Sequence, residues 1–239
     1  MIALFRTLVF FIYFFIITLL FGSVMPLTRL FRLPRRWSYL LGITWMRAVI
    51  QALKYICGMR YHVKGLSNLA KYPNGIIFCK HQSTWETFFV PPLFYSVAII
   101  LKKELLPIPF FGWALNTMGV IAIDRKNKLS ALTQILEQGK ENLTKGRWVL
   151  VFPEGTRVAP GHVGKYHMSG AHLAAETGYP VLPIAHNAGR YWPRNTFIKR
   201  PGTIQVIIGP WIQTRGRTAK DILADAKQWI EAEMLKISM

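Results

Sequence analysis

The sequence is poor in acidic residues and in cysteine. Only 11 Asp and Glu residues stand against 30 Lys and Arg residues in a chain of 239, which gives a formal net charge of +19. Charged residues make up 17%, below the roughly 25% of a typical soluble domain. Hydrophobic residues make up 51%, and this excludes intrinsic disorder. Two cysteines, Cys57 and Cys79, cannot form a disulfide framework, so a reducing, cytoplasm-facing location is favoured.

Long hydrophobic runs are also scarce, which excludes an integral bundle of many helices. Only residues 7–25 are long, apolar and uncharged enough to cross a bilayer. At about 1.5 Å per helical residue they cover roughly 28 Å. A cleaved signal peptide is less favoured, because the run is longer than a signal-peptide core and no Ala-x-Ala site follows Phe21, Gly22 and Ser23. The run therefore predicts a membrane anchor.

The charges around this run predict its orientation. Four arginines follow it, whereas only Arg6 precedes it; the four are Arg29, Arg32, Arg35 and Arg36. The positive-inside rule then places the rest of the chain in the cytoplasm, and the same arginines can bind anionic head groups. Residues 38–58 are rich in aromatic and aliphatic side chains but contain Arg47 and Lys54, which favours an interfacial helix over a second span. A helical hairpin that enters one leaflet is an open alternative to a full crossing.

Beyond residue 60, short apolar runs alternate with helical patterns, as is typical of βαβ units. The expected strands are residues 75–79, 97–101, 119–123, 148–152, 181–185 and 203–208. Apolar stripes at helical spacing predict helices over residues 129–143 and 222–234. We therefore expect an N-terminal membrane-binding segment, residues 1–60, and one α/β domain, residues 61–239.

Polar or ionisable residues follow five of these runs. They are Lys80-His81, Lys102-Lys103-Glu104, Asp124-Arg125, residues 153–157 and His186-Asn187. In open α/β sheets the active crevice lies outside the carboxyl ends of the strands, so these groups are expected to converge on one cleft dominated by cations. Such a cleft suits an anionic substrate.

The segment KHQSTWET offers a catalytic pair. His81 is followed five residues later by Glu86, whose carboxylate can orient an imidazole that acts as a base. Ser83-x-x-Glu86 is also a capping box, which explains both residues without chemistry. The two roles are compatible, because a helix that begins at Ser83 holds Glu86 near His81. Backbone N–H groups near Ser83 are candidates for stabilising an oxyanion.

The segment FPEGTR offers an anion-binding loop. Glu154, the permissive Gly155, Thr156 and Arg157 follow an expected strand, and a guanidinium can bind phosphate through two hydrogen bonds. Glu154 can hold that arginine or another polar group in place. A solvated turn with a surface ion pair is the alternative for any two of these residues.

His81…Glu86, Ile123-Asp124-Arg125, FPEGTR and VLPIAHN occur in this order and together resemble the glycerolipid acyltransferase family, in particular its bacterial 1-acylglycerol-3-phosphate acyltransferases. The resemblance extends from about Lys80 to Asn187. It implies a mixed, largely parallel sheet flanked by helices, behind membrane helices. It also implies transfer of a fatty acyl group from acyl-CoA or acyl carrier protein to the sn-2 hydroxyl of lysophosphatidate, which forms phosphatidate in phospholipid biosynthesis. The cytoplasmic face of a bacterial inner membrane is the expected location, and no metal or other bound cofactor is expected.

The expected roles follow from the residue types. His81 is the general base, and Glu86 fixes its tautomer and stabilises the imidazolium, as the acid does in a serine-protease triad. The family usually has Asp at this position, so Glu86 is a departure that keeps the charge and changes the reach. The absence of a Gly-x-Ser-x-Gly motif agrees with direct attack by the substrate hydroxyl. Phosphate binding is assigned to Arg157, Arg125 and one of Lys102 and Lys103, with Lys103 as the candidate. His186 is expected to be a structural, hydrogen-bonded histidine.

Other functions receive less support. His162, His167 and His172 are five residues apart and do not form a zinc motif. The basic and aromatic C-terminal residues suit a membrane surface or an acidic acyl carrier protein as well as they suit a nucleic acid, so no nucleic-acid partner is expected. They are residues 190–194, Lys199, Arg200, Arg215 and Arg217. Acylation of another lyso-lipid, such as lyso-ornithine lipid, and a non-catalytic basic membrane adaptor stay open. Five aromatic residues are candidates for lining an acyl tunnel, with core packing as the default: Phe88, Phe89, Phe110, Phe111 and Trp113.

Overall fold

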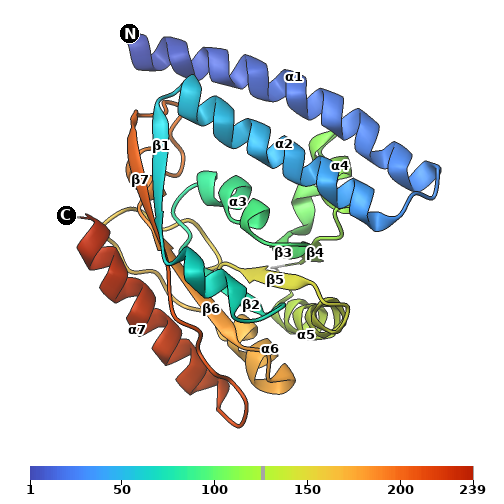
Figure 1. Ribbon diagram of the computed structural model, residues 1–239, viewed down its shortest axis with the longest axis vertical. Helices are drawn as coiled ribbons and strands as arrows, with labels where there is room; N and C mark the ends of the chain where they lie inside the picture. The colour runs from blue at the N-terminus through green and yellow to red at the C-terminus, as the bar shows by residue number, and fades with distance from the viewer. Residues whose placement is uncertain (125–126, 239) are drawn as a thin grey trace.

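The computed structural model describes residues 1–124 and 127–238, and these residues form a seven-stranded sheet flanked by helices on both faces (Figure 1). The strand order is β1-β7-β6-β2-β5-β3-β4, and every neighbouring pair is parallel except the antiparallel pair of β6 and β7. This confirms the expected α/β fold with a mixed, largely parallel sheet. The strands are β1 (Met59–Lys64), β2 (Ile76–Cys79), β3 (Val97–Lys102), β4 (Ile121–Ile123), β5 (Trp148–Val151), β6 (Val181–His186) and β7 (Gly202–Ile208).

Six of these strands match the expected runs within about two residues at either end, but β1 was not predicted. Its sequence MRYHVK contains three charged or ionisable side chains, Arg60, His62 and Lys64, and all three are exposed. Among the described strands β1 pairs with β7 alone and lies at the edge of the sheet. Its residues alternate between exposed and less exposed, so one of its faces meets solvent. An edge strand of this kind alternates polar and apolar residues and lacks the continuous apolar run of a buried strand.

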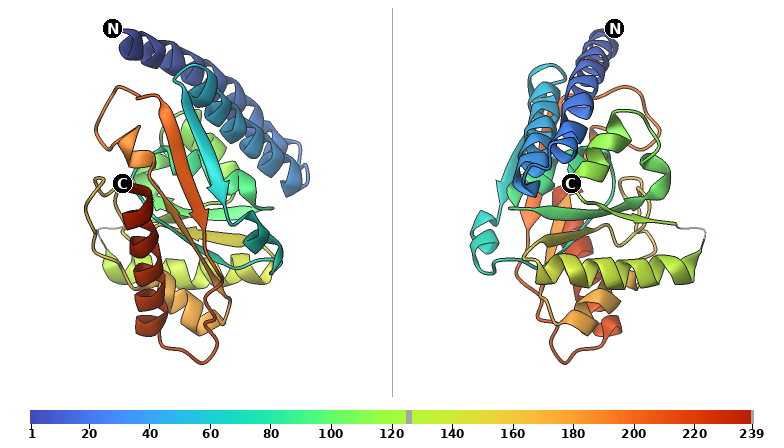
Figure 2. Two further views of the ribbon diagram at one scale, coloured as in Figure 1. Left: turned by 60° about the vertical axis from the view of Figure 1, so that its left-hand side comes forward. Right: turned by 90° about the vertical axis from the view of Figure 1, so that its right-hand side faces the viewer.

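The helices form two layers, one on each side of the sheet (Figure 2). One layer holds α1 (Ile2–Leu30), α2 (Arg35–Tyr55), α3 (Trp85–Phe89) and α4 (Phe111–Thr117). The other layer holds α5 (Lys128–Thr144), α6 (Ser169–Thr177) and α7 (Ala219–Ser238). Short 3₁₀ turns, η1 (Leu66–Ala70), η2 (Pro91–Leu93), η3 (Lys103–Leu105) and η4 (Ala188–Arg190), connect the elements. Two hydrophobic clusters correspond to the two layers.

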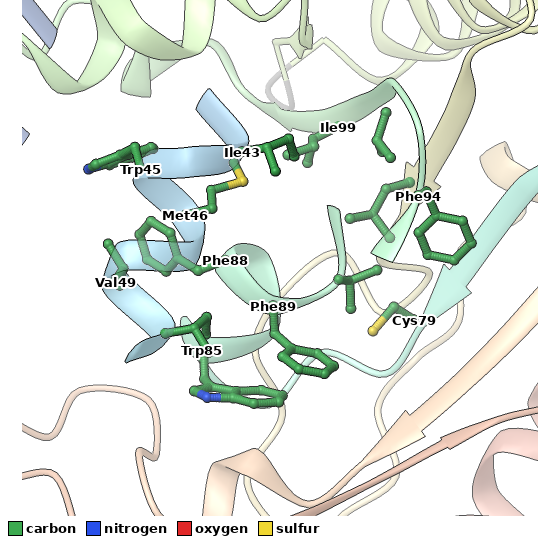
Figure 3. Close-up of a cluster of buried hydrophobic side chains, with 14 of the residues drawn as sticks. Ile43, Trp45, Met46, Val49, Cys79, Trp85, Phe88, Phe89, Phe94 and Ile99 are labelled. Atoms are coloured by element: carbon green, nitrogen blue, oxygen red, sulfur yellow. The ribbon is translucent and has the colours of Figure 1, made fainter. Parts of the chain in front are cut away.

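The cluster between α2, α3 and the sheet sets the position of the site (Figure 3). Trp45 and Met46 of α2 pack with Phe88 of α3, and the rings of Trp45 and Phe88 lie edge to face with centroids 5.3 Å apart. Burial of each such side chain contributes roughly 1.5–3 kcal/mol. Although α3 is a helix of only five residues, this packing holds it firmly against the carboxyl end of β2.

The α1–α2 hairpin lies along this layer and shares its core. Phe10, Ile17 and Met25 of α1 are buried in the same cluster as Trp45. Gly22 permits close approach to α4, because a Cβ at this position would lie 2.4 Å from the carbonyl oxygen of Phe110. The hairpin and the sheet are thus packed together, and the division of the chain at residue 60 stays a prediction.

The other face of α1 is apolar and exposed. α1 is the one helix of the described residues that is long and apolar enough to cross a membrane, and 28% of its apolar window is buried. The exposed side chains include Phe5, Ile12, Phe15, Ile16 and Leu20. A core helix of a soluble protein buries most of such a segment, so this exposed face favours contact with a membrane.

Candidate active site

His81 lies just beyond the carboxyl end of β2, and its backbone is held from both sides. The His81 N–H donates to Oε2 of Glu154 (2.8 Å), and the Val158 N–H donates to the His81 carbonyl (2.8 Å). The imidazole stacks on the ring of Phe152, with centroids 4.3 Å apart. The ring is partly exposed and lines a cavity of the described residues.

Glu86 is fully buried beneath this imidazole. Its Oε1 accepts hydrogen bonds from His81 Nδ1 (2.9 Å) and from the N–H groups of Gln82 (2.9 Å) and Ser83 (2.8 Å). Burial by itself would raise the pKa of Glu86, but His186, His81 and the Ser83 N–H together hold the pKa below its ordinary value. The ionised carboxylate therefore fixes the proton of His81 on Nδ1 and leaves Nε2 as an acceptor that can face substrate.

α3 begins at Trp85 with Thr84 as its N-cap, later than the expected start at Ser83. Oε1 of Glu86 nevertheless makes the contacts that the catalytic and the capping interpretations both expect, with Nδ1 of His81 and with the N–H of Ser83. The N–H of Ser83 is occupied by this oxygen, and the Ser83 hydroxyl accepts from the Trp85 N–H (3.2 Å). The N–H groups of Gln82 and Ser83 both donate to Glu86, so stabilisation of an oxyanion by another backbone N–H near Ser83 stays a prediction.

His186 lies behind the pair and is fully buried. Its Nε2 donates to the Lys80 carbonyl (2.7 Å), and its Nδ1 accepts from the Ala188 N–H (3.2 Å). Burial lowers the pKa of His186, so the ring is neutral, and its two partners define the tautomer. This confirms the expected structural histidine.

The loop of residues 153–157 supports His81 and reaches the cavity. It turns at Gly155, whose φ of 66° lies in the left-handed region that favours glycine. Glu154 points inward and holds the N–H of His81 and the ammonium of Lys80, and it is not paired with Arg157. Burial raises the pKa of Glu154, against the lowering effect of Lys80. Arg157 faces the cavity, where its Nη1 donates to the Thr84 hydroxyl (2.8 Å).

Lys80 is the unexpected member of the site. The sequence pattern placed it among the cations of the cleft, but the structure buries it fully on the other side of the strand end. Its Nζ donates to Oε1 of Glu154 (2.7 Å) and to Oε1 of Glu231 on α7 (2.8 Å), and the hydroxyl of Tyr166 donates to the same Glu231 oxygen (2.7 Å). Lys80 therefore connects the loop of residues 153–157 to the C-terminal helix, α7.

The cavity beside His81 has a volume of about 500 Å³, and both polar and apolar side chains line it. Its polar lining consists of His81, Ser83, Thr84, Thr87, Lys102, Gly155, Thr156, Arg157 and Arg194. Aromatic and aliphatic residues form the rest, most of them from α1, α2, α3, α4 and β3, with Leu105, Phe152 and Trp192 from other segments. Phe14, Met46, Phe88, Ile99 and Leu115 are among them. Within the described ranges no acidic residue lines this cavity.

The remaining expected residues are placed as follows. Lys103 is exposed and pairs with Asp124, whose hydrogen bond raises the pKa of Lys103, whereas its neighbour Lys102 lines the cavity. Arg125 lies outside the described residues. Contact of substrate with Lys103, Arg125, Glu154, Gly155, Thr156 and Arg157 stays a prediction, as do the roles of His81 and Glu86 in catalysis.

Of the aromatic candidates for an acyl tunnel, Phe88 and Phe111 line the cavity. Phe89 packs between the rings of Tyr61 and Trp85, and the rings of Phe110 and Trp113 contact each other instead.

Two of the contributions to the cavity that sequence reasoning missed stand out. The first is Arg194, which lies in the basic segment that was interpreted as a docking surface. The second is a set of α1 side chains, Phe10, Phe11 and Phe14, which belong to the presumed membrane run. Nothing in the local pattern distinguishes these side chains from a lipid-facing apolar run, since only tertiary packing decides which face of α1 turns inward.

A cavity lined both by cations and by many apolar side chains suits an amphiphile with an anionic head. The oriented imidazole in its polar lining suits removal of a proton from a hydroxyl group of that amphiphile. Fold and site thus define an enzyme that transfers a group to an anionic lipid.

Comparison with known proteins identifies the family. The family model described as Acyltransferase matches residues 60–187, more than half of the chain, so the chain belongs to this family and is an acyltransferase.

Named relatives agree with this assignment. A 1-acyl-sn-glycerol-3-phosphate acyltransferase of Pseudomonas aeruginosa is 47% identical over 210 residues, which cover 86% of this chain and 81% of the relative. The Mus musculus 1-acyl-sn-glycerol-3-phosphate acyltransferase alpha is 30% identical over 186 residues, which cover 76% of this chain and 65% of the relative. The crystal structure of the 1-acyl-sn-glycerophosphate (LPA) acyltransferase PlsC from Thermotoga maritima superimposes with a TM-score of 0.81 over 98% of this chain and 95% of that one. At 22% identity this last match supports the fold alone.

Proposed function

We propose that this protein transfers a fatty acyl group from an acyl thioester to the sn-2 hydroxyl of 1-acylglycerol-3-phosphate and so forms phosphatidate. The observation that carries the proposal is the His81–Glu86 pair beside a cavity whose lining combines apolar side chains with cations that have no carboxylate partner among the described residues. The names of the Pseudomonas and mouse relatives support the same substrate.

The reaction needs one proton carrier and no protein nucleophile. Nε2 of His81 removes the proton of the acceptor hydroxyl while the hydroxyl oxygen attacks the thioester carbon. The new C–O bond forms as the C–S bond breaks, and the imidazolium returns its proton to the departing thiolate. The carboxylate of Glu86, 2.9 Å from Nδ1, stabilises the imidazolium in between.

The donor and the location follow from charge. Both acyl-CoA and acyl carrier protein are anionic, and a chain with a net charge of +19 attracts either one. The thioester is a co-substrate, and the reaction requires no bound metal or other cofactor. The arginines after α1 support placement of the site on the cytoplasmic face of a bacterial inner membrane. Arg157, with Arg125 and Lys103 or Lys102, holds the acceptor phosphate.

An assay of phosphatidate formation tests the proposal. Detergent-purified protein receives 1-acylglycerol-3-phosphate with a long-chain acyl-CoA or acyl carrier protein, and parallel reactions receive lyso-ornithine lipid. We expect activity on the phosphate-bearing acceptor and a loss of about 10²–10⁴-fold in kcat for His81→Ala. His172→Ala, an exposed histidine of α6, is the matched control and should keep wild-type turnover.

Two results would contradict the proposal. Activity on lyso-ornithine lipid alone would contradict the proposed acceptor but would be consistent with the proposed mechanism. Undiminished turnover in His81→Ala would refute the proposed mechanism, because His81 would then not be the general base.

A further inference from the structure

The segment of residues 191–200, here called the strap, connects η4 to β7 and contributes two side chains, Trp192 and Arg194, to the active-site cavity. The Arg200 N–H donates to the Tyr191 carbonyl (2.9 Å) and closes the two ends of the strap on each other. The proposed function gives the strap no task, although one of its arginines lies in the polar lining.

Lys199 fastens one end of the strap to α1. Its backbone N–H donates to the Thr7 hydroxyl (3.0 Å), and its Nζ lies 3.8 Å from the ring centroid of Phe11 and 4.4 Å from that of Trp192. The side chain is 1% exposed, so these cation–π contacts form away from solvent, where they contribute most. Phe11 also stacks on Phe197 of the strap, with centroids 4.9 Å apart.

Arg194 fastens the strap to the loop of residues 153–157. Its Nη1 donates to the Thr156 hydroxyl (3.0 Å) and lies 3.5 Å from the Arg157 carbonyl. A guanidinium has five N–H donors, and these contacts use one of its nitrogens. The other nitrogens are available to a ligand in the cavity.

Arg194, Arg157 and Lys102 therefore line one cavity together, and among the described residues none of the three has a carboxylate partner. Three cations without a counter-ion repel one another, and a bound anion relieves this repulsion. Two guanidinium groups match a phosphomonoester, which offers three oxygens and close to two negative charges.

We propose that Arg194 is a second guanidinium ligand of the acceptor's phosphomonoester and that the strap exists to place it beside Arg157. This inference rests on the proposed function and specifies how its site recognises the acceptor.

Acyl-CoA also carries a phosphomonoester, and geometry favours the acceptor. In 1-acylglycerol-3-phosphate the phosphate is attached to the carbon next to the reacting sn-2 carbon, so it must lie close to His81. Arg194 is bound to the loop whose Glu154 holds the His81 N–H. The 3′-phosphate of CoA, by contrast, is separated from the thioester by the whole pantetheine arm.

Steady-state kinetics of Arg194→Ala and Arg194→Lys test the inference, with the acceptor and acyl-CoA varied separately. A charge-assisted hydrogen bond contributes about 1.5–3 kcal/mol, which corresponds to roughly 10–150-fold. We expect the KM for 1-acylglycerol-3-phosphate to rise by this factor in Arg194→Ala and by less in Arg194→Lys, with kcat within about threefold of wild type. Arg190→Ala and Arg200→Ala, exposed arginines next to and within the strap that do not line the cavity, should behave as wild type.

A second readout uses 1-acylglycerol, which lacks the phosphate. The preference of the wild type for the phosphorylated acceptor should shrink in Arg194→Ala, an effect that a merely structural role would not produce. A rise in the KM for acyl-CoA alone, or an unchanged KM for both substrates, would overturn the inference while the wild-type activity stands. A wild type that is inactive on the phosphorylated acceptor would instead refute the proposed function.

Discussion

The Glu86→Gln substitution keeps the shape of a fully buried side chain and removes its charge. Oε1 of Glu86 accepts three hydrogen bonds, one from Nδ1 of His81 and two from backbone N–H groups. A glutamine oxygen can still accept these bonds, so the loop should stay in place. The carboxylate that balances the imidazolium is lost, and the expected damage is to catalysis.

The magnitude follows from burial. Removing one partner of a buried ion pair costs about 3–5 kcal/mol, because the remaining charge is left uncompensated. In this reaction that charge exists only while His81 holds the proton, so the cost falls on the transition state. At about 1.36 kcal/mol per tenfold in rate, kcat should fall by roughly 10²–10⁴-fold with little change in KM.

Glu86→Asp is the matched comparison, and it tests the departure from the family's usual aspartate. It keeps the charge but withdraws the carboxylate by one methylene, about 1.5 Å. One oxygen then cannot stay within hydrogen-bond distance of Nδ1 and both N–H groups. We expect a smaller loss in kcat, roughly 10–100-fold.

The assay measures release of the free thiol of CoA together with phosphatidate, at saturating acceptor, for wild type and both variants. Thermal denaturation of each variant checks that the fold is retained. If folded Glu86→Gln keeps kcat within threefold of wild type, the carboxylate serves only as a helix cap and the proposed mechanism fails.

Three further predictions concern stability, chain length and pH. Lys80→Met leaves the buried carboxylate of Glu154 and the partly buried carboxylate of Glu231 without their shared cation. It should lower the free energy of unfolding by about 3–5 kcal/mol in chemical denaturation, and a loss below 1 kcal/mol would contradict the role of Lys80. Leu115→Trp fills part of the apolar lining and should reduce kcat/KM about tenfold or more for a long-chain donor relative to a short-chain one, whereas equal losses would place the acyl chain elsewhere. Folding lowers the pKa of Glu86 below 4.5, so as the pH falls the Glu86 carboxylate is protonated in the unfolded chain before it is protonated in the folded protein. The ionised Glu86 therefore stabilises the fold fully above pH 4.5, and this stabilisation is lost as the pH falls toward the folded-state pKa. Between pH 5 and 3 the free energy of unfolding should fall less steeply in Glu86→Gln than in wild type. Equal slopes of the free energy of unfolding against pH would refute this assignment.

Much of the sheet was predictable because parallel strands are buried on both faces. Short, continuously apolar runs such as residues 76–79 and 181–185 are typical of strands that helices cover on both faces, and they form β2 and most of β6. β1 escaped prediction because an edge strand can keep charged residues on its exposed side. The His81–Glu86 pair was predictable for a different reason. His81 follows β2 and Glu86 lies in the first turn of α3, so the two residues are five positions apart and their contact is local.

The cations of the site were predictable as a group but not one by one. Lys80, Lys102 and Lys103 all follow strands, yet the structure buries Lys80, turns Lys102 into the cavity and pairs Lys103 with Asp124. Adjacent side chains of an extended chain point to opposite sides of the sheet. A shift of one residue at the end of a strand reverses these sides without any change in sequence composition, so composition does not show which lysine faces the cavity.

The sequence by itself thus determined the α/β class, the contact of His81 with Glu86 and the tight loop of residues 153–157. Each of these depends on hydrophobic periodicity or on residues within about one turn of each other. Only the tertiary structure decided that α1 supplies part of the cavity lining, that Glu231 reaches Lys80 from the last helix, and that Arg194 joins Arg157. These contacts join segments far apart in the chain. Their geometry depends on sheet order, on the antiparallel β6–β7 pair and on the packing of the hairpin, and no local pattern specifies any of the three.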